Sequence, residues 1–222
     1  MAPHDAHGTP VADPILNLKS QILNPVELIP EDYFRPLRRE EIFPNPARPL
    51  ELDIGCGDGT FLLEMAQHFP GHDFLGVERL GGRVSKIVRQ AHRRGLTNAR
   101  VLCLETGYTL AWLLPDACAD RLHLLFPDPW PKAKHAARRF IQPDNLAAIH
   151  RVLQPDGELL FKTDHAEYFE AAIGELDASP LFTRLPWLSD DAFYPQTDFE
   201  KLWLSQGCTI HAARWVKAPP LP

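Results

Sequence analysis

The feature that most constrains the fold is a regular alternation of short apolar runs with amphipathic stretches from about residue 49 onward. Such alternation is typical of βα units, which build a parallel sheet covered by helices. The predicted strands are 50–54, 73–77, 99–104, 120–126 and 157–163, and the predicted helices are 60–69, 83–95, 109–114, 143–153 and 165–177. Two later runs, 181–185 and 209–216, are expected to complete the sheet as an antiparallel hairpin at its edge.

Length and composition favour a single domain. The chain has 222 residues, of which 45% are hydrophobic, and this is enough to bury one full-sized core. Many of its 22 prolines lie in the first fifty residues and in the tail "APPLP", where their fixed φ disfavours regular structure. We therefore expect a Pro-rich N-terminal segment that wraps or frays over 1–48, an α/β domain over 49–217 and a flexible tail over 218–222.

Charge and cysteine content exclude several classes of protein. A net charge of −6 argues against a uniformly basic nucleic-acid binder, although local basic patches remain possible. The four cysteines form no C-x-x-C pair, so we expect no metal site and no disulfide framework. No stretch has the length of a signal-peptide core or of a membrane span, and reduced thiols fit the cytoplasm. A cytoplasmic location is expected.

Carboxylates follow five successive predicted strands. Ligands of parallel α/β sheets bind at the carboxyl ends of the strands, so the residues at these ends are candidates for a site. The five acids are Asp53, Glu78, Glu105, Asp128 and Asp164. A carboxylate at a strand end can also cap the following helix, but capping alone does not account well for five in succession.

A glycine-rich loop, "DIGCGDGTF" (53–61), lies between the first strand and the first helix. Its spacing, G-x-G-x-G at Gly55, Gly57 and Gly59, differs from the G-x-G-x-x-G of dinucleotide-binding loops. A glycine turn alone is a weak signal, but Asp53 sharpens it, because this acid would repel a pyrophosphate and attract an ammonium group. The ligand expected at the loop is therefore cationic.

The next two acids complete the description of this ligand. Glu78 ends "FLGVE", where an acid in nucleotide-binding α/β proteins accepts hydrogen bonds from ribose hydroxyls. Glu105 is placed to accept from an adenine amino group. A cationic adenosine ligand without phosphate is best matched by S-adenosylmethionine. The alternative for Glu78 is a solvated acid that offsets Arg79 and Arg83.

The stretch "FPDPWPK" (126–132) predicts a rigid corner at the end of the fourth strand. Pro127 and Pro129 fix their own φ and should push Phe126 and Asp128 toward extended conformations. Asp128 would then be held in place beside the ligand, while Trp130 packs as a wall or stacks on a flat substrate. The alternative is a purely structural turn.

The corner is followed by a basic run that contains no acid, which predicts a surface for phosphate groups. Its members are Lys132, Lys134, His135, Arg138 and Arg139. A second set of basic residues on the predicted helix 83–95 is a weaker candidate, because charges on a helix face are more often only solvated. That set contains Arg83, Lys86, Arg89, Arg93 and Arg94.

Taken together, the motifs "LDIGCGDG", "FLGVE", "FPDPWPKAKHAARR", "TDHAEY" and "TDFE" resemble the bacterial tRNA (guanine-N7-)-methyltransferase family over about residues 50–203. The "FPDPW" motif followed by lysine is specific to this family, whereas many methyltransferases share the glycine loop. The resemblance implies a Rossmann-like, seven-stranded methyltransferase fold with S-adenosylmethionine as methyl donor. It also implies tRNA as substrate, modified at the guanine of position 46 in the variable loop.

The resemblance also implies roles for individual residues. Donor contacts are implied for Asp53, Gly55, Gly57, Glu78, Glu105 and Asp128, and Asp128 is the catalytic candidate. Substrate contacts are implied for Lys132, Asp164, Thr197, Asp198, Phe199 and Glu200, and RNA contacts for Lys134, His135, Arg138 and Arg139. The chain departs from the family at Asp53, often glutamate there, and at Glu105, often aspartate. The sequence leaves open whether the protein is a monomer or a homodimer.

The expected chemistry needs no base, because guanine N7 carries a lone pair and no proton. Alignment of the two reactants is then the main requirement. Asp128 would either hold the guanine through its N1 and amino hydrogens or favour the cationic product electrostatically. Two alternatives remain: a methyltransferase for a small molecule or protein, and an RNA-binding protein that has lost methyl transfer.

Overall fold

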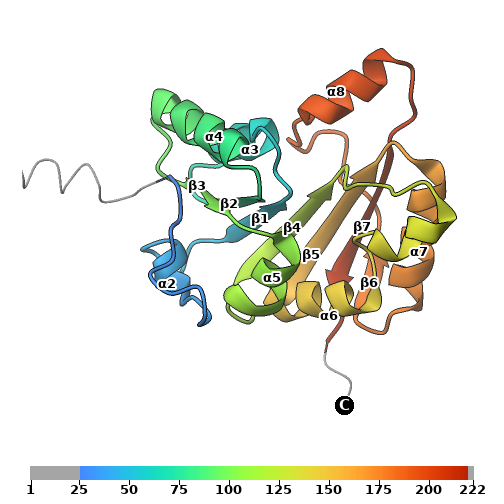
Figure 1. The fold of residues 1–222 in the computed structure, drawn as a ribbon, viewed down its shortest axis with the longest axis horizontal. Helices are drawn as coiled ribbons and strands as arrows, with labels where there is room; N and C mark the ends of the chain where they lie inside the picture. Colours follow the sequence, from blue (N-terminus) through green and yellow to red (C-terminus); the bar gives the residue numbers. More distant parts are fainter. Residues whose placement is uncertain (1–25, 220–222) are drawn as a thin grey trace, which may run out of the picture.

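The computed structural model describes residues 26–219 and contains a seven-stranded sheet (Figure 1). The strand order is β3-β2-β1-β4-β5-β7-β6. The parallel strands are β1 (Leu50–Ile54), β2 (Asp73–Glu78), β3 (Ala99–Cys103), β4 (Ala119–Leu125) and β5 (Leu153–Thr163). At the edge, β7 (His211–Lys217) runs antiparallel to both β5 and β6 (Phe182–Leu185). The predicted fold class is therefore confirmed.

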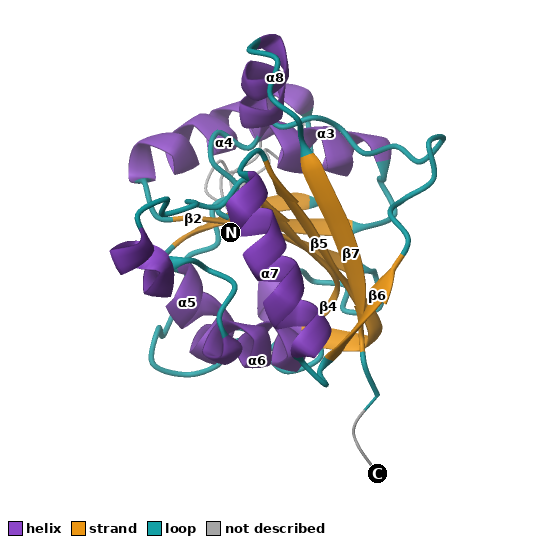
Figure 2. Ribbon diagram, turned by 90° about the vertical axis from the view of Figure 1, so that its right-hand side faces the viewer, coloured by secondary structure: helices purple, strands orange, loops and turns teal. Residues whose placement is uncertain are grey.

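Helices cover both faces of the sheet (Figures 1 and 2). One face is covered by α3 (Thr60–His68) and α4 (Gly81–Arg94), and the other by α5 (Thr106–Tyr108), the π-helical turn η1 (Thr109–Leu113), α6 (Pro143–Val152) and α7 (Ala166–Ala178). Four helical segments were not expected from the sequence, namely α2 (Arg39–Ile42), α5, the 3-10 helix η2 (Ala133–Arg138) and α8 (Asp198–Ser205). In both views α8 stands clear of the sheet, and it contacts α3 through a hydrogen bond between Asp198 and Thr60.

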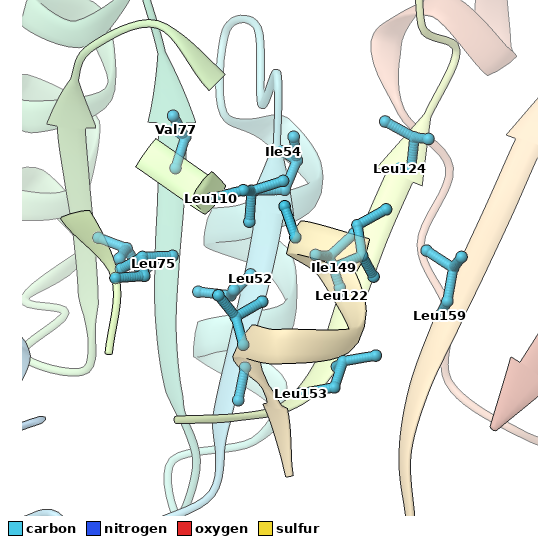
Figure 3. Close-up of a cluster of buried hydrophobic side chains, with 14 of the residues drawn as sticks. Leu52, Ile54, Leu75, Val77, Leu110, Leu122, Leu124, Ile149, Leu153 and Leu159 are labelled. Atoms are coloured by element: carbon cyan, nitrogen blue, oxygen red, sulfur yellow. The ribbon is translucent and has the colours of Figure 1, made fainter. Parts of the chain in front are cut away.

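The alternating direction of side chains along β1 divides the molecule into two layers. Leu52 and Ile54 point toward η1 and α6 (Figure 3), and together with Leu50 they join the larger apolar cluster. Glu51 and Asp53 point to the other face, where α3 and α4 pack. Each fully buried leucine of this kind stabilises the fold by roughly 1.5–3 kcal/mol.

A buried polar network lies on that second face. Glu51 accepts a hydrogen bond at 2.8 Å from each of two imidazoles, His123 and His72, and His123 also lies 2.9 Å from the hydroxyl of Tyr194. Burial alone would raise the pKa of Glu51, but the hydrogen bond and charge of His123, followed by His72, lower this pKa to about 2. The network joins β1 and β4 to the segment that precedes α8.

The N-terminal segment contacts the outer edge of β3. Leu28 N donates to the carbonyl of Val101 at 2.8 Å, and Val101 N donates to the carbonyl of Val26 at 2.7 Å. The Arg100 guanidinium donates to the carbonyl of Ile42 at 2.6 Å. Residues 1–25 of the expected N-terminal segment and 220–222 of the expected tail lie outside the described residues.

The four cysteines are free thiols, and Cys118 is buried in the core. Among residues 26–219, no group of three or more His, Cys, Asp or Glu side chains is arranged to hold a metal ion. The helices in this range are all too short or too polar to cross a membrane.

Glu51→Gln is expected to lower the free energy of unfolding by about 3 kcal/mol, because it removes the charge from a buried network whose imidazoles remain. Chemical denaturation near neutral pH measures this change. Glu64→Gln is the control, since Glu64 lies at the surface, 3.8 Å from Lys201, and such pairs contribute little. Equal effects of the two substitutions would contradict the assigned role of Glu51.

Candidate active site

Two cavities with a shared wall lie at the carboxyl ends of the central strands. Their volumes are about 170 and 540 Å³, and Gly55, Arg83, Leu125 and Phe199 line both. The smaller cavity is also lined by Asp53 and residues 56–61, and the larger by Glu78, Glu105 and Asp128. Four of the five strand-end acids therefore surround one site, at the rim of the sheet where parallel α/β folds bind ligands.

The glycine loop forms the floor of the smaller cavity. Gly55, Gly57 and Gly59 have φ values of 70°, 57° and 78°, in the left-handed region that side chains with a Cβ disfavour. Gly55 N donates to the carbonyl of Val77 at 2.9 Å, which ties the loop to β2. At Gly59 a Cβ would lie 2.5 Å from the Ile87 side chain, so glycine is required for the close approach of α3 to α4.

Asp53 is the most perturbed acid of the site. Its side chain is almost fully buried at 4% exposure, and it lies beside a second acid, Glu78. Burial, and secondarily the charge of Glu78, raise the pKa of Asp53 from 3.8 to about 7. A cation bound in the smaller cavity would compensate both effects, so this carboxyl group favours a positively charged ligand.

Glu78 and Glu105 line the larger cavity with different local roles. Glu78 is buried, accepts from Leu80 N at 2.8 Å and lies 3.5 Å from the guanidinium of Arg83, so it is not a solvated surface acid. Glu105 caps α5 by accepting from Gly107 N at 2.8 Å and Tyr108 N at 2.7 Å. Each carboxylate oxygen keeps a further lone pair that can accept from a ligand.

The Pro-Asp-Pro corner differs from the sequence expectation at one residue. Phe126 is left-handed with φ 53° rather than extended, because its N–H still donates to the carbonyl of Lys162 at 2.8 Å while the chain turns away from the sheet. Trp130 is also left-handed, with φ 42°. Two such residues on either side of Asp128 cost about 1–3 kcal/mol each, and strain of this size is concentrated at functional sites.

The basic run divides into exposed and buried members. Lys132, Lys134 and Arg138 are exposed, and the Arg138 guanidinium lies 5.0 Å from the centre of the Trp130 ring. Half-buried His135 meets the same ring edge-on at 5.8 Å. Arg139 is instead buried and braces the corner.

Three contacts define this bracing role of Arg139. Its Nε donates to the carbonyl of Pro129 at 2.9 Å, its Nη2 donates to Glu167 at 3.3 Å, and its guanidinium lies 5.3 Å from the Tyr168 ring centre. An arginine held in this way is not available to a phosphate group.

The motif "TDFE" begins α8 and contacts the smaller cavity. Thr197 caps the helix by accepting from Glu200 N at 3.0 Å, and Asp198 accepts from the hydroxyl of Thr60 at 2.7 Å. Thr197, Asp198 and Phe199 line the cavity, whereas Glu200 is buried and forms a 2.6 Å ion pair with Lys162. Glu200 therefore anchors α8 to β5.

Three predicted substrate contacts lie outside the cavity walls, and the buried Glu200 is one of them. Asp164 follows β5 directly and is half-buried, while Lys132 is exposed at the start of the basic run; neither residue lines either cavity. Sequence reasoning also missed the inward position of Arg83 and the network of Glu51. The signal of that network in the sequence was Glu51 in β1 and His123 in β4, each a polar residue between two leucines.

The fold is shared with solved methyltransferase structures. The antibiotic-resistance methyltransferase Kmr is similar with a TM-score of 0.57 and 20% identity, over 83% of this chain and 95% of that one. A second structure, an antibiotic-related methyltransferase, has a TM-score of 0.54 and 18% identity, over 89% of this chain and 99% of that one. At this level of identity the likeness defines the class, a Rossmann-like methyltransferase fold.

Sequence comparison defines the family. A family model described as "Putative methyltransferase" matches residues 47–213. A tRNA (guanine-N(7)-)-methyltransferase of Parasynechococcus marenigrum is 35% identical over 82% of this chain and 81% of its own length. A relative of the same name from Syntrophotalea carbinolica is 31% identical over 86% of this chain and 83% of its own length. Another, from Nitrobacter hamburgensis, is 36% identical over 73% of this chain and 60% of its own length. The chain belongs to the tRNA (guanine-N7-)-methyltransferase family, whose methyl donor is S-adenosylmethionine.

Affinity for S-adenosylmethionine is expected to fall as pH decreases below about 7. The raised pKa of Asp53 means that part of this group is protonated near neutrality, whereas the cationic donor favours the ionised form. Binding below pH 7 must therefore release a proton, at a cost of up to tenfold in affinity per pH unit. Calorimetry between about pH 5.5 and about pH 7.5 measures the affinity at each pH. Repeating it in buffers of different ionisation enthalpy measures the number of protons released on binding.

Asp53→Asn is the control for this measurement. It removes the titrating carboxyl group and should abolish most of the pH dependence along with much of the affinity. If the pH profile of Asp53→Asn matches that of the unmodified protein, another group is responsible.

Proposed function

We propose that this protein transfers the methyl group of S-adenosylmethionine to N7 of a guanine in tRNA, with position 46 of the variable loop as the target. The observation that best supports this function is the adjacency of an acid-lined double cavity, a rigid Pro-Asp-Pro corner and an exposed basic run. Each of the three suits a different part of the reaction: the donor, the base and the RNA backbone.

The chemistry of the cavity walls fits S-adenosylmethionine. Asp53 and the glycine loop in the smaller cavity suit its methionine part, while Glu78 and Glu105 in the larger cavity suit the ribose and adenine. When bound, this donor supplies an electrophilic methyl group on a sulfonium.

The residues of the corner would position the guanine. Asp128 lines the larger cavity, and its carboxylate can accept hydrogen bonds from the N1 and amino groups of the base. Trp130 lines the same cavity and offers a flat face for stacking. Because N7 needs no deprotonation, such alignment can supply roughly 7–11 kcal/mol of the rate enhancement.

The tRNA backbone would contact the exposed part of η2. Lys134, His135 and Arg138 are proposed to bind phosphates, with Lys132 and Asp164 nearer to the modified nucleotide. Buried Arg139 supports the corner from below. Either a monomer or a homodimer could present this surface, and a tRNA substrate implies a cytoplasmic location.

One assay tests the proposed function as a whole. The protein is incubated with radiolabelled S-adenosylmethionine and unmodified tRNA, and the product is cleaved chemically at N7-methylguanosine. Label in tRNA with cleavage at position 46 supports the proposal. Labelling of a small molecule or protein instead, or donor binding without transfer, would favour one of the two alternatives.

Asp128→Asn is expected to reduce kcat about 100-fold, because a positioned polar group is lost from the reacting centre. The Kd for S-adenosylmethionine should change far less. Single-turnover kinetics and calorimetry separate the two effects. Asp144→Asn, at an exposed acid on α6, is the control and should leave both values unchanged. Undiminished turnover of Asp128→Asn would refute the role of Asp128.

Lys134→Gln combined with Arg138→Gln is expected to weaken tRNA binding and to flatten its salt dependence. Each lost phosphate contact should reduce the slope of log K against log salt by about 1. Filter binding over a range of salt concentrations gives this slope. Arg184→Gln, at an exposed residue of β6 near Asp177, is the control for a change of charge. A slope that stays the same removes this surface from the interface.

A further inference from the structure

We propose that Arg83 binds the carboxylate of the methionine part of the donor and thereby selects S-adenosylmethionine over analogues that lack this group. The inference rests on the proposed function, since it takes S-adenosylmethionine as the ligand of the double cavity. It concerns a residue that the sequence places in a basic helix face and that the structure turns toward the site.

Arg83 lies across the glycine loop. It occupies the first turn of α4 and lines both cavities. Its Nη1 is 3.5 Å from Glu78 Oε2, its Nε is 3.7 Å from Asp58 Oδ1, and a Cβ at Gly57 would lie 4.0 Å from Nη1. The guanidinium is therefore held between two acids, directly above the loop that approaches the ligand.

The charges of the smaller cavity show why a cation is needed there. Asp53, Asp58 and Asp198 are in its wall, and Arg83 is its single basic residue among those lining it in residues 26–219. A cavity with acids alone would repel the carboxylate of a zwitterionic amino acid and would prefer a simple amine. Arg83 is the group that can reverse this preference.

Arg83 also has N–H donors that are available to a ligand. Its two ion-pair distances exceed the 2.7–3.2 Å of well-formed hydrogen bonds, so neither acid holds it tightly. A guanidinium presents five N–H donors in a planar fork that matches a carboxylate. A small movement of this half-exposed side chain would exchange weak contacts with Asp58 for a bidentate contact with the ligand.

Lys86 provides a matched comparison. It lies one turn further along α4, and its Nζ is 2.5 Å from the same acid, Asp58, but it lines neither cavity. Removing the charge of Lys86 therefore changes the surroundings of Asp58 without removing a group from the cavity wall.

The test compares two ligands, S-adenosylmethionine and decarboxylated S-adenosylmethionine, by calorimetry on the full chain. The unmodified protein should prefer the carboxylated donor. Arg83→Gln should weaken binding of S-adenosylmethionine about 10- to 100-fold, which is what hydrogen bonds to a charged group contribute to affinity. The same substitution should leave binding of the decarboxylated ligand unchanged or make it tighter. Arg83→Lys should retain part of the preference, and Lys86→Gln should retain all of it.

Several results would overturn the proposal. Equal weakening of both ligands by Arg83→Gln, with a matching loss of thermal stability, would assign Arg83 to support of the loop. Weaker tRNA binding with an unchanged preference between the ligands would assign it to the RNA surface. If the unmodified protein binds neither ligand, the donor assignment of the proposed function fails, and this result is distinct from a failure of Arg83 alone.

Discussion

The site depends on two acids that are buried next to each other. Asp53 and Glu78 end neighbouring parallel strands, and both are almost inaccessible to water. Desolvation and mutual repulsion disfavour two negative charges there, which is why the pKa of Asp53 rises to about 7. A cationic ligand relieves both penalties, so the site favours binding of a positively charged ligand. The chain as a whole is also acidic.

Much of this arrangement follows from the sequence because it is set by local pattern. The strand–helix alternation predicts the parallel strands closely, and topology then brings Asp53, Glu78, Glu105 and Asp128 to one rim. The helix α8 was missed because it is short, and its start is fixed by the Thr197 cap and by burial of Glu200 against Lys162. Contacts of that kind depend on tertiary packing.

The polar network and the buried arginine could not be predicted from the sequence, because they too depend on tertiary packing. Glu51 and His123 are 72 residues apart, and their contact depends on the pairing of β1 with β4. In the basic run, sequence shows that Arg138 and Arg139 are both charged but not which one turns inward. The inward residue holds the carbonyl of Pro129, so neighbouring arginines support the same corner in different ways, one from the surface and one from the interior.

The pairing of residues 26–28 with β3 has a consequence for the molecule outside its active site. An unpaired outer strand presents free N–H and C=O groups that can recruit another chain into a continuous sheet. Here Val26 and Leu28 hydrogen-bond with Val101 and occupy part of that edge. A chain shortened to the region that matches the family would leave these N–H and C=O groups of Val101 unpaired, and we expect such a chain to associate edge to edge more readily.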